Sequence, residues 1–273
     1  MTPPTGTGSE GPAKERKTLD KVVIRFAGDS GDGMQVTGTH FTNTAAILGN
    51  DLATFPDFPA EIRAPAGSLP GVSGFQIQFA ASDVHTPGDR PDVLVAFNPA
   101  ALKVSLKDMP ANSVIIVNTD SFGEVDLKKA NCATNPLDDG TLDKYQAYKI
   151  PITELTMKAL ESIKFPEKDR PNKERQKNFF ALGILYWLYN RPTDTTMNAI
   201  DREFGKKKNG ALIVQAAQTA PNAGIAYAEA TELFRSQYSV PAAKYEKGTY
   251  RNISGNVALA LGLVTASELG GIP

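Results

Sequence analysis

The residues best suited to chemistry lie in a short glycine-rich turn between an apolar run and a helical pattern. Gly28 ends the apolar stretch VVIRFAG, Gly31 and Gly33 follow within a few residues, and the pattern MQVTGTHFTNTAAILG begins next. Glycines let the backbone turn sharply from a buried strand into a helix and leave its amide groups open to a ligand. The chemistry that this favours is ligand binding by backbone amides.

The spacing of this turn differs from the two common nucleotide-binding motifs. It reads G-x-x-G-x-G, and so matches neither the G-x-G-x-x-G of dinucleotide folds nor the G-x-x-x-x-G-K-S/T of phosphate-binding loops. Asp29 and Asp32 lie inside it and would repel a phosphate unless a cation or a partner chain offset their charge. Two interpretations follow. Either a ligand is held by amides turned away from the acids or is shared with another subunit, or this is a tight packing turn in which an Asp caps the helix.

A second group of candidates lies in the proline- and glycine-rich stretch 56–74, which we expect to be a long, stiff loop of the functional kind. Glu61 and Arg63 stand in its middle. They either brace the loop as a surface ion pair, or Arg63 meets an anionic ligand or a partner's carboxylate. Asn98 ends a later apolar run, where open α/β sheets place ligand-contacting side chains. Capping of the following helix is an equal alternative for Asn98.

The elements that must position these residues alternate between strands and helices. We expect strands at 21–27, 74–80, 92–97, 113–118 and 145–150, and helices at 33–48, 100–108, 152–163, 173–189, 193–204 and 211–234, the last interrupted at Pro221. The segment 173–189 is apolar around most of its circumference, which places it in the interior or at a subunit interface. This order predicts an α/β fold, a three-layer α/β/α domain with a mainly parallel sheet.

The two ends of the chain differ from this alternating middle. Residues 1–19 are polar and are expected to be a flexible tail before a domain at 20–238. The range 239–250 lacks apolar periodicity and is expected to be a linker. Within 251–273, Asn252 or Ser254 can cap a helix that contains several small residues. We expect this helix to be the first element of a second, incomplete domain.

Composition excludes several classes of protein. An apolar fraction of 41% and a charged fraction of 22% are typical of globular proteins, and no apolar run reaches the roughly 20 residues that a membrane span needs. The net charge of −1 does not favour nucleic acid, and the lysines at 206–208 indicate a solvated helix end. Cys132 is the single cysteine, so this chain cannot by itself hold an iron–sulfur cluster or a structural zinc, and a cytoplasmic location is expected. His40 and His85 are expected to be structural or exposed.

Four motifs, taken together and in order, resemble the γ domain of the 2-oxoacid:ferredoxin oxidoreductases, most closely that of the large (α) subunit of the 2-oxoglutarate enzymes. They read GDSGDG at 28–33, PAEIRAPAG at 59–67, DVLVAFN at 92–98 and KNFFALG at 177–183. The resemblance covers about residues 20–270, and the closing YRNISGNVALALG is similar to the start of the thiamine-diphosphate-fold domain that follows in this family. Many γ domains carry Gly-Gly-Gln-Gly where this chain has Asp-Ser-Gly-Asp at 29–32, so contacts of that glutamine do not carry over.

The resemblance implies oxidative decarboxylation of a 2-oxoacid, with 2-oxoglutarate foremost, to an acyl-coenzyme A and carbon dioxide, with electrons passed to ferredoxin. It implies an α2β2 heterotetramer in which thiamine diphosphate, Mg²⁺ and a 4Fe-4S cluster belong to the β subunit. This chain then holds no metal, supplies no catalytic residue and is inactive in isolation. No nucleic acid or membrane partner is implied.

The resemblance also suggests which residues line the cleft for coenzyme A or thiamine diphosphate. We expect these to be Gly28, Asp29, Ser30, Gly31 and Gly33, with Arg63 as the charge partner and Asn98 at the neighbouring strand end. The residues do not distinguish contact with coenzyme A, with thiamine diphosphate or with protein alone. Two other classes stay open: a non-catalytic α/β scaffold subunit of an oxidoreductase complex, and a free-standing flavodoxin-type nucleotide-binding protein, against which the two acids in the turn weigh.

Overall fold

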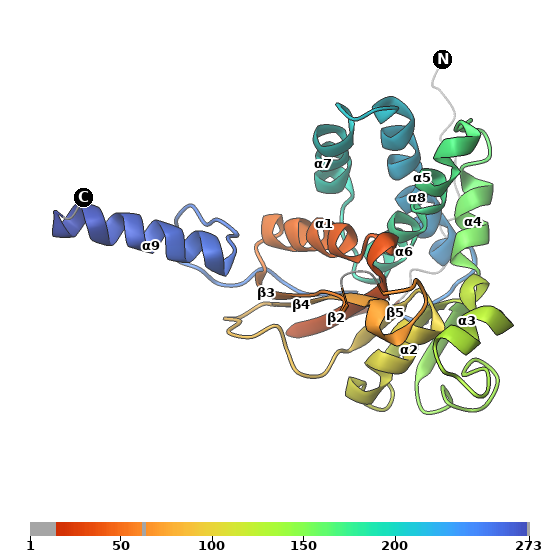
Figure 1. The fold of residues 1–273 in the computed structure, drawn as a ribbon. Coiled ribbons are helices and arrows are strands. Elements are labelled where there is room, and N and C mark those ends of the chain that lie inside the picture. The colour runs from red at the N-terminus through yellow and green to blue at the C-terminus, as the bar shows by residue number, and fades with distance from the viewer. Residues whose placement is uncertain (1–14, 62–63, 272–273) are drawn as a thin grey trace, which may run out of the picture. The chain divides into compact units, whose positions relative to one another are not determined.

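The computed structural model describes residues 15–61 and 64–271 (Figure 1). The chain divides into two compact units, and the boundary between them in the sequence lies between Ala243 and Lys244. None of the helices among the described residues is both long and apolar enough to span a bilayer.

The first unit is built on a six-stranded sheet with the strand order β3-β4-β2-β5-β6-β7. The strands are β2 (Lys21–Asp29), β3 (Asp51–Asp57), β4 (Val72–Ala80), β5 (Val93–Ala96), β6 (Val114–Asn118) and β7 (Gln146–Ile150). β2, β5, β6 and β7 are parallel, whereas β4 runs antiparallel to both β2 and β3. The predicted mainly parallel sheet is confirmed.

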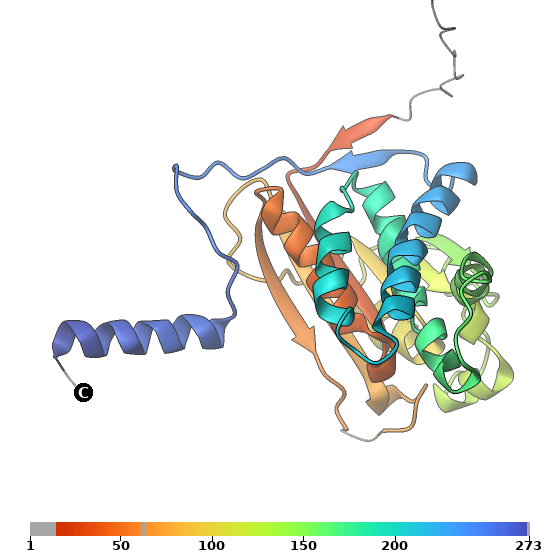
Figure 2. The same ribbon diagram turned by 90° about the horizontal axis from the view of Figure 1, so that it is seen from above.

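Helices cover both faces of this sheet, which gives the three expected layers (Figures 1 and 2). On one face lie α1 (Met34–Ile47), α4 (Ile152–Ala159), α5 (Arg170–Glu174), α6 (Lys177–Leu188), α7 (Asp194–Phe204) and α8 (Gly210–Ala230). On the other lie α2 (Pro99–Ser105) and α3 (Glu124–Lys129). Short 3₁₀ turns complete the unit: η1 (Ser30–Asp32), η2 (Leu69–Gly71), η3 (Leu106–Asp108), η4 (Thr119–Ser121) and η5 (Glu167–Asp169).

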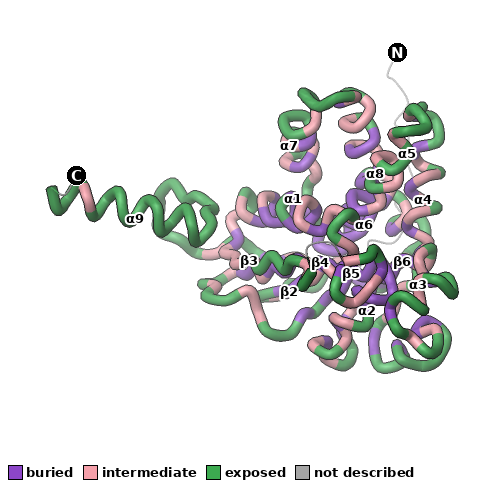
Figure 3. The backbone as a smooth tube through the Cα atoms, viewed as in Figure 1, coloured by how far each residue is buried: buried purple, intermediate pink, exposed green. Residues whose placement is uncertain are grey.

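The central strands are apolar at consecutive positions because both of their faces are buried (Figure 3). In β5, Val93 and Val95 join the core beneath α1 and α6, whereas Leu94 and Ala96 join a second core with Leu102 of α2. The period of two along a strand thus builds two hydrophobic cores from one short sequence. These cores fix the carboxyl ends of β2 and β5 side by side.

Three sequence-based expectations in this unit were wrong in detail. The expected loop 56–74 is shorter, because β3 extends to Asp57 and β4 begins at Val72. β3 was missed because Pro56 and two acids make DLATFPD a poor strand pattern, which is tolerated at a sheet edge. The helix expected at 173–189 is two helices, α5 and α6, and α8 continues through Pro221 without interruption.

The segments next to the two predicted ends of the domain are more ordered than expected. β1 (Arg16–Thr18), within the range expected to be a tail, pairs in parallel with β8 (Gln237–Ser239). Asn50 Nδ2 donates to the carbonyl oxygen of Pro241 at 2.6 Å, so the first residues of the expected linker are attached to the domain. The second unit contains α9 (Gly255–Gly270), whose cap is Ser254 rather than Asn252.

Candidate functional site

The glycine-rich turn lies at the carboxyl end of β2, beside the carboxyl end of β5. The chain leaves β2 for α1 on one face of the sheet and leaves β5 for α2 on the other (Figure 1). Open α/β sheets bind ligands at such a point, where neighbouring strands lead to helices on opposite faces. Both the turn and Asn98 therefore stand where the fold alone places a site.

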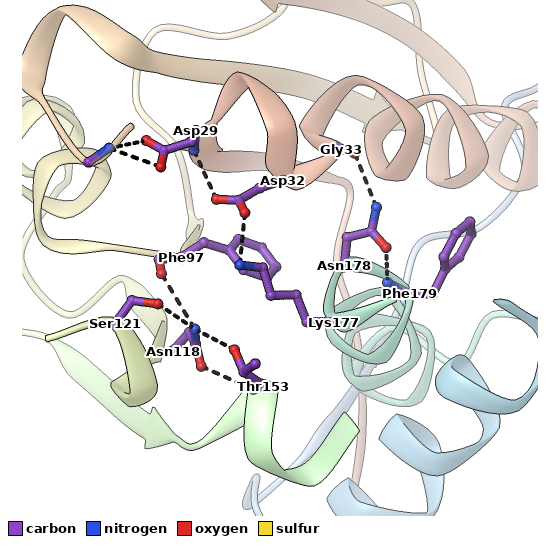
Figure 4. A network of polar contacts seen from close by, with 11 residues as sticks. Asp29, Asp32, Gly33, Phe97, Asn118, Ser121, Thr153, Lys177, Asn178 and Phe179 are labelled. Carbon is purple, nitrogen blue, oxygen red and sulfur yellow. Dashed lines mark hydrogen bonds and ion pairs between the residues drawn. The ribbon is translucent and has the colours of Figure 1, made fainter. Parts of the chain in front are cut away.

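Asp29 connects the turn to the proline-rich loop (Figure 4). Its two carboxylate oxygens each accept a hydrogen bond from the Gly67 amide at 3.0 Å. Burial raises the pKa of Asp29, and the neighbouring Asp32 adds to this, while hydrogen bonds from Gly67 and Asn98 and the charge of Lys177 lower it. The Asp29 carboxylate thus forms a hydrogen bond within the protein, and Asp29 also lines a cavity beside the turn.

Asp32 is held at both of its oxygens. Oδ2 accepts the Asp29 amide at 2.9 Å, and Oδ1 forms an ion pair with Lys177 Nζ at 2.8 Å. The side chains of Asp32 and Lys177 are each only 15% exposed, and the ammonium group lies 5.8 Å from the centre of the Phe97 ring (Figure 4). The sequence left open a cation or a partner chain to offset the acids of the turn, and the structure places a cation, Lys177 at the start of α6, beside Asp32.

Lys177 and Asn178 were missed as site residues, although they open the KNFFALG motif. Asn178 Nδ2 lies 3.5 Å from the carbonyl oxygen of Gly33, so α6 contacts the turn through consecutive side chains (Figure 4). The only signal in the sequence was the need for a cation or a partner chain to offset the acids of the turn, which did not identify the lysine.

The three glycines are needed for different reasons. Gly33 has φ +78°, and a Cβ there would lie 2.3 Å from Asn178 Nδ2. At Gly28 a Cβ would lie 2.9 Å from Asp32 Oδ2 and 3.2 Å from Phe97 Cβ. A Cβ at Gly31 would meet no atom within 4 Å. Packing explains Gly28 and Gly33, whereas Gly31 leaves an open surface.

The structure describes Asn98 but not Arg63, the two other predicted site residues. Asn98 is 5% exposed, and its Oδ1 accepts the Ala101 amide at 2.8 Å, so the capping alternative is the one that the geometry supports. Arg63 lies outside the described residues, so its predicted contact with an anion stays a prediction.

Two cavities flank the turn. One, of about 410 Å³, is lined by the turn, by five described residues of the proline-rich loop and by a segment at the start of the helical layer: Pro59, Glu61, Ala64, Ala66, Gly71, Pro171, Glu174, Arg175 and Lys177. The other, of about 380 Å³, lies toward Phe179 and Phe204. Ser30 and Gly31 are exposed and line both cavities, so they form the wall between them. Larger cavities of about 590 and 610 Å³ lie elsewhere and include no residue of the turn.

Asn118, at the carboxyl end of β6, connects this strand to the residues that follow β6 and β7. Its Nδ2 donates to Thr153 Oγ1 at 3.1 Å and to Ser121 Oγ at 3.2 Å, and its Oδ1 accepts the Thr153 amide at 3.3 Å (Figure 4). The side chain is fully buried. These hydrogen bonds hold the carboxyl ends of the strands in place and use both polar atoms of the Asn118 side chain within the protein.

The described part of the chain contains no group of three or more His, Cys, Asp or Glu side chains placed to hold a metal ion. His40 is 3% exposed, and burial lowers its pKa to about 4, as expected for a structural histidine. His85 is exposed and Cys132 is half-buried.

Comparison with known proteins identifies the family. Residues 23–227 match the family of pyruvate ferredoxin/flavodoxin oxidoreductases, and the chain belongs to this family. The 2-oxoglutarate oxidoreductase subunit KorA of Mycobacterium tuberculosis is 51% identical over 96% of this chain, which spans 39% of that relative. The resemblance inferred from the four motifs is confirmed.

Solved structures agree with the fold. A 2-oxoglutarate:ferredoxin oxidoreductase from Magnetococcus marinus, with 2-oxoglutarate, coenzyme A and succinyl-CoA bound, has a TM-score of 0.66 and 25% identity over 91% of this chain and 38% of its own. The γ subunit of a keto/oxoacid ferredoxin oxidoreductase from Geobacter sulfurreducens has a TM-score of 0.50 and 17% identity over 76% of this chain and 98% of its own. The second likeness concerns the fold alone.

Proposed function

We propose that this chain is the γ-domain part of the large subunit of a 2-oxoglutarate:ferredoxin oxidoreductase. The observation that carries the proposal is the 51% identity, over 96% of the chain, to a 2-oxoglutarate oxidoreductase subunit. The reaction is the oxidation of 2-oxoglutarate with release of carbon dioxide, transfer of the succinyl group to coenzyme A and passage of two electrons to ferredoxin. The bound molecules named for the Magnetococcus marinus enzyme support this choice of substrates.

In this proposal the chain contributes a wall of the coenzyme A cleft. Ser30 and Gly31 are exposed between two cavities, and a hydroxyl group and backbone amides there are suitable donors to a ligand. Gly28 and Gly33 stabilise this wall through close packing, and Asp29 stabilises it through its hydrogen bond with the Gly67 amide. Arg63, on the adjoining loop, stays the proposed charge partner.

The redox cofactors are proposed to lie outside this chain. Four thiolates usually hold a 4Fe-4S cluster, and the chain has one cysteine, so the residues present do not fit a cluster. We assign the cluster, thiamine diphosphate and Mg²⁺ to a β subunit in an α2β2 assembly, which supplies electrons to ferredoxin in the cytoplasm. The alternative is a non-catalytic scaffold, because the internal pairing of both acids is also what a packing turn would have.

Substitution of Gly31→Val in the complete enzyme distinguishes the two functions. A side chain there meets no protein atom within 4 Å, so we expect an unchanged melting temperature. The branched side chain blocks close approach of a ligand to the amides, each of which contributes about 1.5 to 3 kcal/mol when bonded to a charged group. We therefore expect the KM for coenzyme A to rise by about tenfold or more, measured by steady-state kinetics.

Two further variants serve as controls for this experiment. Gly33→Ala should lower the melting temperature, because φ is positive and Asn178 is in the way. Ser30→Ala removes only the hydroxyl group and should raise the same KM by a smaller factor. Normal coenzyme A kinetics in both Gly31→Val and Ser30→Ala would exclude ligand binding by the turn and favour the scaffold.

A further inference from the structure

The ion pair between Asp32 and Lys177 is the strongest unexplained feature of the turn. It is short, at 2.8 Å, and both side chains are 15% exposed, whereas most ion pairs of surface residues are loose and solvated. It also joins the turn to the first residue of α6, which is remote in sequence. Partial desolvation strengthens the interaction between the two charges. Removal of either charge would therefore leave the other poorly solvated and would destabilise the protein.

The pair acts on the backbone of the turn through Asp32. The oxygen that does not contact Lys177 accepts the Asp29 amide at 2.9 Å, so Lys177, Asp32 and the Asp29 backbone form a continuous chain of contacts. Asn178 lies 3.5 Å from the Gly33 carbonyl oxygen at the other end of the turn. Ser30, Gly31 and Asp32 lie between these two attachments, and Ser30 and Gly31 line both cavities.

The pair also contributes to the charge beside the cavity of about 410 Å³. The charged residues of its lining are four acids, Asp29, Asp32, Glu61 and Glu174, and two bases, Arg175 and Lys177. Their formal net charge is −2 with Lys177 and −3 without it, so the ammonium group lowers the repulsion of an anion by this wall.

We infer that Lys177 is the positioning residue of the turn: it holds Ser30 and Gly31 at the cavity wall through Asp32 and offsets the charge that would repel an anionic ligand. The inference rests on the proposed function, since it takes coenzyme A, which carries phosphate groups, as that ligand. Lys177 acts through Asp32 and does not itself contact the ligand.

The test uses the complex of this chain with its partner subunits and the variants Lys177→Met, Lys177→Arg and Lys158→Met. Methionine keeps the length of the side chain and removes its charge, whereas arginine keeps the charge. Lys158 lies on the exposed side of α4 and provides a control for the loss of one positive charge. Two quantities are measured: hydrogen exchange of the amides in residues 28–36, and the separate kcat and KM values for coenzyme A and for 2-oxoglutarate.

For Lys177→Met we expect exchange in the turn and the KM for coenzyme A each to rise by about tenfold or more, because a buried charge-assisted contact is lost. The kcat and the KM for 2-oxoglutarate should stay near their normal values. Lys177→Arg keeps the positive charge, so exchange in the turn and the KM for coenzyme A should stay close to those of the unaltered complex. Lys158→Met should change neither the exchange nor the KM.

Other results would overturn the inference in separate ways. A normal KM for coenzyme A in Lys177→Met leaves the pair with a structural role only. A raised KM with unchanged exchange makes Lys177 a direct ligand contact instead of a positioning residue. If the unaltered complex does not oxidise 2-oxoglutarate with coenzyme A, the proposed function fails, and exchange alone then decides whether Lys177 positions the turn.

Discussion

His40 illustrates how a single buried residue couples stability to pH. Its side chain lies in α1 against Phe179, with the ring centres 5.3 Å apart, and is 3% exposed. Glu203 Oε2 is 3.5 Å from Nε2, yet neither ring nitrogen has a hydrogen-bond partner among the described residues. A carboxylate at this distance would favour the charged ring, but burial dominates and lowers the pKa of His40 to about 4.

The lowered pKa of His40 predicts a loss of stability in mild acid. The ordinary pKa is 6.5 and the folded value is about 4, so the unfolded chain binds the extra proton first as the pH falls between these values. Stability is complete above pH 6.5 and decreases as the pH falls toward 4, by on the order of 3 kcal/mol in total. Urea unfolding at several pH values should show a flatter dependence for His40→Leu than for the unaltered protein.

Exposed His85 provides the matched control for this measurement. The variant His85→Leu should keep the pH dependence of the unaltered protein. Parallel curves for His40→Leu and the unaltered protein would contradict the assignment of the effect to His40.

At the residue scale, the sequence predicted the turn and the need for a cation or a partner chain to offset its acids, but it did not identify the residue that does so. Asp29 and Asp32 both lie inside the turn, so the repulsion that they would exert on a phosphate could be predicted directly. Lys177 reaches the turn only because α6 packs beside α1 on the sheet, and nothing local in KNFFALG records that contact. Asn98 could not be resolved because an N-cap and a ligand contact require the same residue type at the same place.

The helices α6 and α8 pack closely against each other through glycines. A Cβ at Gly183 would lie 2.0 Å from the carbonyl oxygen of Pro221, and a Cβ at Gly224 would lie 2.1 Å from that of Phe180. Each helix thus offers a glycine to the backbone of the other. This contact holds α6, and with it Lys177, against the rest of the helical layer.

The substitution Gly183→Ala should therefore destabilise the protein, although alanine is the better helix former. The added methyl group meets backbone, which cannot move aside as a flexible side chain can, and overpacking of a core costs about 1 to 3 kcal/mol. Gly262→Ala in α9 is the control, because a Cβ there meets nothing within 4 Å. It should be neutral or stabilising by about 0.5 to 1 kcal/mol. Chemical denaturation of both variants measures the difference, and equal effects would contradict the close crossing.

At the element scale, the buried central strands and the long helices were predictable and the edge of the sheet was not. VVIRFA is apolar except for Arg25, and VLVAF is a continuous apolar run, because helices cover both faces of the sheet; this pattern has few alternatives. β3 is stabilised by pairing with β4 along its whole length, so its own sequence carries little of the signal.

For the whole molecule, the chain spans about two fifths of the length of the Mycobacterium tuberculosis subunit and of the Magnetococcus marinus chain that it matches. The glycine turn, both flanking cavities and the two cores belong to the first unit, so the described residues of the candidate site all lie in that unit. Each unit of the chain has a separate role in the proposal: the first lines the cleft, and α9 in the second resembles the start of a further domain. The domain limits of 20–238 and 251–273 stay predictions.

Because the redox cofactors are proposed to belong to a β subunit, we predict that the 273-residue chain alone does not catalyse the reaction. Transfer of electrons to a one-electron acceptor requires a redox group, and Cys132 alone cannot ligate a cluster that uses four thiolates. An anaerobic assay with 2-oxoglutarate, coenzyme A, thiamine diphosphate, Mg²⁺ and a viologen dye should show no reduction by this chain. The same assay with the complete oxidoreductase is the positive control and should show dye reduction that depends on coenzyme A. Dye reduction by the isolated chain would mean that it holds a redox centre of its own, and the assignment of all redox chemistry to the β subunit would then be wrong.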